Sequence, residues 1–175
     1  MEDILTSIIG IAIAAILMFI FPLMTMSDRT DDVSQLTVEI ATTEFTDDVR
    51  LSGKITADAY SKYLENLGST GNTYNVEIEV KILDENPSRK SIKDNRTGSD
   101  STENVYYSVY TSQIEDILNK NETYYLKEGD IIIVSAKNTS QTIAQQLKNF
   151  FYTVVGKDIY TIVSSHSGMI IATGI

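Results

Sequence analysis

The sequence contains no cysteine and no tryptophan, and it has one histidine and two prolines among its 175 residues. Without cysteine, the chain can form no disulfide, no thiolate nucleophile and no cysteine-ligated metal site. Basic residues are also scarce, because 14 Lys and Arg stand against 24 Asp and Glu, and the net charge is −10. A surface of this sign repels phosphate backbones, so nucleic acid is disfavoured as a partner.

Only one stretch of the chain is long and apolar enough to cross a bilayer. It runs from Ile4 to Met26, and it holds no charged residue over 23 positions. A helix needs roughly 20 apolar residues to span the hydrocarbon core. A cleaved signal peptide is the competing interpretation, but no Lys or Arg precedes the stretch and its end, LMTMSD, offers no small-residue cleavage site. We therefore expect residues 1–26 to form a retained membrane anchor in contact with lipid, and Lys and Arg are too few to set its orientation.

The segment from Ser27 to Leu51 contains no Gly or Pro and is expected to continue the anchor as a helical stalk over residues 27–52. Apolar residues at helical spacing form two neighbouring stripes, namely Val38, Ala41, Phe45 and Val49, and Val33, Leu36 and Ile40. The alternation across Leu36–Ile40 also permits a strand. Gly53 would end the helix, because glycine caps a helix C-terminus at little cost.

Residues 53–175 form the predicted head domain. Its first half is expected to contain a helix capped by Thr56 and reaching Leu67, a strand over Tyr74–Ile82, a long polar loop over Asp84–Asn104, and a short strand over Val105–Tyr110. Its second half is expected to contain a helix capped by Thr111 or Ser112, a strand over Ile131–Ser135, and a helix over Thr139–Val154. A final hairpin of Ile159–Val163 and Met169–Ala172 is expected around a turn at Ser164–Gly168. This order predicts an α+β fold, with a small, mostly antiparallel sheet covered by helices.

The sequence offers no set of catalytic residues. His166 lies in a Ser-Ser-His-Ser-Gly run that is typical of a surface turn, and no nucleophile-elbow or phosphate-binding loop is present. Glu77 and Glu79 alternate with apolar residues, which indicates a solvated strand face. The run Asp94–Asp100 has oxygen-bearing side chains, but Arg96 stands where a calcium ligand is needed. We therefore assign no catalytic, cofactor-binding or metal-binding residue, expect no enzyme, and infer no small-molecule substrate.

Four residues in the anchor carry the assembly hypothesis. Gly10 is small and permits close helix–helix contact, whereas Pro22 leaves a backbone acceptor unpaired and kinks a helix. Glu2 and Asp3 precede the apolar run, where a carboxylate is favourable at a helix N-terminus and could pair with the terminal amine of a neighbouring subunit. An ordinary anchor with two solvated acids explains the same residues.

This layout resembles the pilin-like proteins of type IV filament systems. Within residues 1–83 it is most similar to the minor pilins, or pseudopilins, of Tad-like systems in Gram-positive bacteria, and the phrases Gly53–Thr56, Tyr60–Leu67 and Thr70–Tyr74 carry that similarity. The resemblance implies a single-pass membrane protein whose head lies outside the cytoplasm. It also implies assembly with other pilins or with a pilus or secretion platform. A basic leader, which prepilins normally carry, is not visible.

Two functions therefore remain open from the sequence. The first is a membrane-anchored, pilin-like structural subunit. The second is a single-span binding module, in which the tyrosine-rich segment Tyr106–Tyr125 or the loop Asp84–Asn104 would engage a ligand.

Overall fold

The computed structural model describes residues 2–84, 90–93, 100–103, 106–140, 146, 149–150, 153 and 161–174. Its elements are α1 (Glu2–Ser52), β1 (Lys54–Ile55), α2 (Ala57–Gly68), β2 (Tyr74–Leu83), β3 (Lys90–Lys93), β4 (Asp100–Glu103), β5 (Tyr106–Tyr110), α3 (Thr111–Leu118), β6 (Tyr124–Tyr125), β7 (Ile131–Asn138) and β8 (Val163–Met169). This confirms the predicted α+β fold with a long apolar N-terminal helix.

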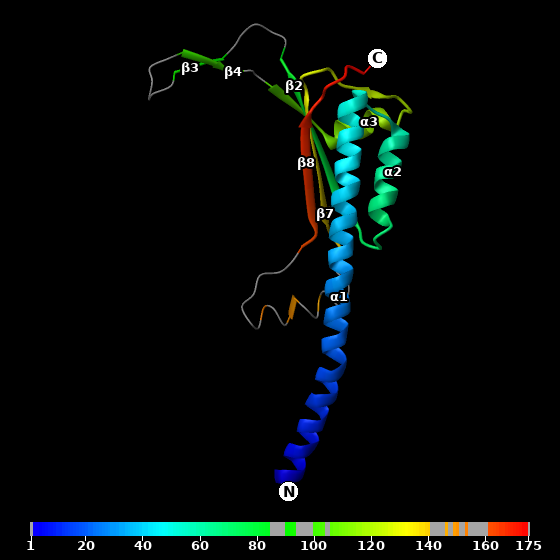
Figure 1. The fold of residues 1–175 in the computed structure, drawn as a ribbon, viewed down its shortest axis with the longest axis vertical. Coiled ribbons are helices and arrows are strands. Elements are labelled where there is room, and N and C mark those ends of the chain that lie inside the picture. The colour runs from blue at the N-terminus through cyan, green and yellow to red at the C-terminus, as the bar shows by residue number, and fades with distance from the viewer. Residues whose placement is uncertain are drawn as a thin grey trace.

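A four-stranded antiparallel sheet forms the centre of the head, in the order β5-β2-β7-β8. The C-terminal half of α1 runs beside β8, and α2 lies next to α1 (Figure 1). The N-terminal half of α1 projects away from the head, and the C-terminus lies near the end of α1 that is farthest from the N-terminus (Figure 1). Two further pairs, β1-β6 and β3-β4, stand outside this sheet.

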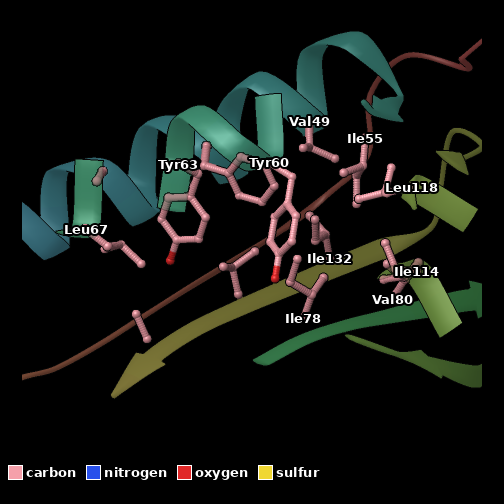
Figure 2. Close-up of a cluster of buried hydrophobic side chains, with 14 of the residues drawn as sticks. Val49, Ile55, Tyr60, Tyr63, Leu67, Ile78, Val80, Ile114, Leu118 and Ile132 are labelled. Atoms are coloured by element: carbon pink, nitrogen blue, oxygen red, sulfur yellow. The ribbon is translucent and has the colours of Figure 1, made fainter. Parts of the chain in front are cut away.

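The hydrophobic core lies between the helices and one face of the sheet (Figure 2). Burial along β2 follows the period of two that the sequence predicts, because Ile78 and Val80 are buried, Glu79 between them is partly exposed, and Glu77 is exposed. Phe45 of α1 stacks on Tyr63 of α2, with ring centroids 4.6 Å apart and planes 8° from parallel. This stack joins the two helices over the sheet.

The turn from α1 into α2 follows the predicted chemistry. Gly53 has a φ of +67° and its N–H donates to the Val49 carbonyl at 2.8 Å, which closes the end of α1. Thr56 then caps α2, because its Oγ1 accepts from the Ala59 N–H at 3.2 Å. Both predictions for this segment are confirmed.

The predicted C-terminal hairpin is wrong. The run Ser164–Gly168, taken as the turn, lies inside β8, which pairs with β7 along its whole length. Small and polar residues occur here because α1 crosses close to this strand. A Cβ on Gly168 would collide with the side chain of Arg50. The composition of the run reflects the proximity of a helix, and it does not mark a reversal of the chain.

The segment predicted as one polar loop, Asp84–Asn104, also contains regular structure. β3 and β4 within it form an antiparallel pair, in which Lys90 stands opposite Glu103 and Lys93 opposite Asp100. The remaining residues of this segment lie outside the described ones.

Two smaller differences concern the middle of the chain. Neither predicted residue caps α3. Instead Gln113 accepts from the Tyr110 N–H at 3.1 Å, and Thr111 bonds to β2. β7 extends three residues beyond Ser135. The helix predicted over Thr139–Val154 lies largely outside the described residues.

Candidate membrane anchor and assembly surface

α1 is one uninterrupted helix of 51 residues. At 1.5 Å per residue it is about 77 Å long. Its segment from Ile4 to Met26 is exposed almost throughout, and none of its most apolar window is buried. It is the one described helix that is long and apolar enough to span a membrane, and it lies near the N-terminus. The predicted continuation of the anchor into the head is confirmed.

The four predicted assembly residues all lie in the free part of α1, but they do not form one cluster. Glu2 and Asp3 occupy its first turn. Gly10 and Pro22 are twelve residues apart, which places them about 120° apart around the helix axis and about 18 Å apart along it. A Cβ on Gly10 would meet nothing within 4 Å. These four residues are therefore distributed along the part of α1 that projects away from the head (Figure 1).

Pro22 lies within the helix, in the part where the helix is free of the head. It has no N–H to donate to the Met18 carbonyl, and its ring crowds that carbonyl. The helix axis changes direction in this free part (Figure 1). One turn further on, Thr25 Oγ1 donates to the Phe21 carbonyl at 3.0 Å. The polar side chain thus bonds to its own helix, which suits an apolar surrounding.

The C-terminal half of α1 buries the first stripe of apolar residues that the sequence predicts. Val38, Ala41, Phe45 and Val49 are all at most 5% exposed. Polar residues complete the buried side. Thr42 and Thr46 donate to the carbonyls of Val38 and Thr42, each at 2.7 Å, and Thr42 Oγ1 lies 3.1 Å from the Tyr63 hydroxyl. Periodicity alone could not identify these threonines as core residues.

The second stripe of α1 remains uncovered in the described part of the chain. Val33, Leu36, Ile40 and Leu51 are 66%, 58%, 48% and 63% exposed, and together we call them the outer stripe. Val33 and Leu51 are five turns apart, so they lie on one line along the helix. Glu44 and Asp47 interrupt that line near its C-terminal end. The stalk therefore has two apolar faces, of which the described part of the head covers one.

α1 is fixed to β8 by polar contacts near both ends of the strand. The Gln35 amide bonds to both backbone groups of Val163, at 2.9 and 3.2 Å. Arg50 Nε donates to the Met169 carbonyl at 3.1 Å, and the Arg50 carbonyl accepts from the Ile171 N–H at 3.1 Å. Sequence reasoning missed these residues, because a single polar side chain on a helix carries no signal of its distant partner.

The residues considered for catalysis lie apart from one another. His166 is a strand residue and not a turn residue, and its Nε2 lies 3.7 Å from Asp47 Oδ1, which also pairs with Arg50 at 2.6 Å. Glu79 accepts from the Ser108 hydroxyl at 2.6 Å. The described residues contain no group of three or more His, Cys, Asp or Glu that could hold a metal ion.

Comparison of the chain with protein-family models, with curated proteins and with solved structures finds no significant match.

Proposed function

We propose that the protein is a membrane-anchored, pilin-like structural subunit that assembles with other pilins or with a pilus or secretion platform in the membrane. One observation carries this proposal. α1 is a continuous helix whose first half contacts no described part of the head, and whose second half keeps an exposed outer stripe next to its buried face.

The exposed apolar residues of α1 extend beyond the part that lipid would cover. Lipid suffices for residues 4–26, but the outer stripe begins at Val33, beyond the apolar run. Burying one Ile or Leu side chain that water would otherwise contact contributes about 1.5–3 kcal/mol. A second helix along the stripe would bury several such side chains at once. Gly10 and the nearby alanines would allow the same helices to approach closely within the bilayer.

The head is proposed to lie outside the cytoplasm, on the basis of the resemblance to pilins. Ser61 on α2 is exposed, and the chain has no native cysteine, so Ser61→Cys gives one defined thiol on the head. In intact cells, a membrane-impermeant maleimide is expected to label this variant to the level seen after lysis. Labelling that appears only after lysis would place the head inside and contradict this part of the proposal.

Cross-linking in the membrane tests assembly. Ile40→Cys puts a thiol on the outer stripe, and Ser61→Cys serves as the matched control on an exposed head helix. With a short maleimide–diazirine cross-linker in native membranes, whose maleimide reacts with the thiol and whose diazirine inserts into any neighbouring protein on illumination, Ile40→Cys is expected to give cross-linked species that contain pilin-like partners or a second copy. Ser61→Cys should remain largely monomeric. If both variants stay monomeric at equal thiol reactivity, the outer stripe is not an assembly surface.

A further inference from the structure

Besides the outer stripe of α1, the edge of β2 is a second surface without a partner in the described part of the chain. β7 pairs with β2 from Tyr74 to Lys81, whereas β5 pairs with it only from Glu79 to Leu83. In the described part of the chain, the first half of β2 therefore has a strand on one side only. β5 does not continue along it, because the chain turns into α3 at Thr111.

The hydroxyl of Thr111 shows which backbone groups face this edge. It accepts from the Ile78 N–H at 2.7 Å and lies 3.3 Å from the Ile78 carbonyl, to which it donates. Ile78 therefore directs both backbone groups away from β7. Backbone groups alternate in direction along an antiparallel strand. Val76 and Tyr74, two and four residues earlier, consequently direct their N–H and C=O groups toward the same edge. Thr111 bonds only to Ile78 there, so it does not cover these groups.

A groove of about 660 Å³ runs along this edge. Tyr60 and Leu64 of α2 line it on the helix side, while Glu77 and Ile133 line it on the other face of the sheet. The segment Tyr74–Ile78 contains no Lys or Pro, the residues that commonly protect exposed edges from pairing. An extended chain that paired with this edge would therefore find space for its side chains on both faces of the sheet.

The charge of the groove selects the kind of chain. Among the described residues that line it are three glutamates, Glu77, Glu79 and Glu115, and no Lys or Arg. Glu77 and Glu79 stand on the face of β2 opposite the core. Because β5 already occupies the position opposite Glu79, a strand added beside Val76 would place the side chains on its outer face next to Glu77, and those on its other face next to Leu64 and Tyr60.

We propose that the free edge of β2 binds an extended segment of a partner protein in which basic residues alternate with apolar ones. The segment adds a strand to the sheet, so backbone hydrogen bonds to Val76 and Tyr74 provide affinity, while lysine or arginine next to Glu77 provides selectivity. This inference does not depend on what covers the outer stripe of α1.

The test uses the full-length protein in detergent micelles and three fluorescein-labelled nonapeptides, with binding measured by fluorescence anisotropy. The first peptide alternates valine and lysine, the second alternates valine and glutamate, and the third is the valine–lysine peptide with alternate backbone amides N-methylated. The first is expected to bind at least about tenfold more tightly than either of the others, because they lack the charge or the backbone donors. Equal binding of the methylated peptide would overturn strand addition, and equal binding of the glutamate peptide would overturn the charge argument.

Two variants locate the site. Glu77→Lys is expected to weaken binding of the valine–lysine peptide by about tenfold or more. Glu122→Lys changes the net charge equally at an exposed position outside the groove, and it should bind like the wild type. Bound peptide should also slow hydrogen exchange of the Val76 amide. Equal losses in both variants, or unchanged exchange at Val76 under saturating peptide, would overturn the proposal.

Discussion

The side-chain amide of Gln35 pairs with the backbone of Val163 as another strand would. Its Nε2 donates to the Val163 carbonyl at 2.9 Å, and its Oε1 accepts from the Val163 N–H at 3.2 Å. Val163 begins β8, which is an edge strand of the four-stranded sheet, and Gln35 and Val163 are 128 positions apart in the sequence. A residue of the stalk thus satisfies an edge of the sheet that would otherwise be open to solvent and to other chains.

We expect Gln35→Met, which keeps the length of the side chain, to lower the free energy of unfolding by about 1 kcal/mol, because two hydrogen bonds are lost at a partly exposed site. Urea unfolding of the full chain in micelles, followed by tyrosine fluorescence, measures this change. Thr37→Val is the control, since Thr37 is on the same helix and bonds only to the Val33 carbonyl within it. Equal stability of Gln35→Met and wild type would mean that water replaces Gln35 without cost.

Gly53→Ala should be among the most destabilising substitutions of a glycine. The residue has a φ of +67°, and a Cβ there would collide with the backbone of Ala172 and Gly174. Gly71→Ala is the matched control, because Gly71 has a φ of +76° but open space around its Cβ position. Backbone strain alone costs about 1 kcal/mol, so Gly71→Ala should lose about that amount and Gly53→Ala at least about twice as much. Similar losses in urea unfolding would show that the C-terminal segment can shift.

The elements that the sequence predicted correctly are those in which burial follows a regular period. Val38 and Phe45 recur at helical spacing, and Ile78 and Val80 alternate with polar residues, so each pattern records which face meets the core. The two apolar stripes of the stalk were also visible in the sequence. Which of them the head covers was not, because that depends on where the sheet lies.

β8 could not be predicted for a related reason. Its residues facing α1 include Ser164, which is buried, and Gly168, whose missing Cβ leaves room for Arg50. Small residues in a strand usually indicate a turn, and only the position of a helix more than 100 residues earlier in the sequence explains them here. The groove along β2 was equally hidden, since the place where β5 departs from its neighbour depends on the register of the sheet.

Alkaline pH should destabilise the head in part through Tyr124. Burial, and then the charges of Asp130 and Tyr107, raise the pKa of Tyr124 from 10.0 to about 12. The unfolded chain deprotonates near pH 10, so the stabilising contribution of the neutral phenol is complete below that pH and is lost as the pH rises toward 12. Tyr124→Phe should therefore lose less unfolding free energy than wild type between pH 10 and 12.

The control for this prediction is Tyr125→Phe, because the neighbouring Tyr125 is 56% exposed. It should follow the wild-type pH profile in urea unfolding. Burial also raises the pKa of Tyr60 and Tyr63, so some loss of stability remains in every variant. Parallel profiles for Tyr124→Phe and wild type would show that Tyr124 ionises in the folded head without cost.

The two halves of α1 should respond differently to substitution, since only the second half contributes to the core of the head. Gly10→Leu is expected to leave urea unfolding of the head unchanged, because a side chain there meets no described part of the head. Phe45→Ala removes the ring stacked on Tyr63 and should cost about 3–5 kcal/mol. If Gly10→Leu lowers head stability, the free half of α1 contacts the head in micelles.

If Gly10→Leu leaves head stability unchanged, the same substitution in the Ile40→Cys background becomes a selective probe of helix packing. A loss of cross-linking there could then arise only from α1 meeting its partner in the membrane, and not from a damaged head.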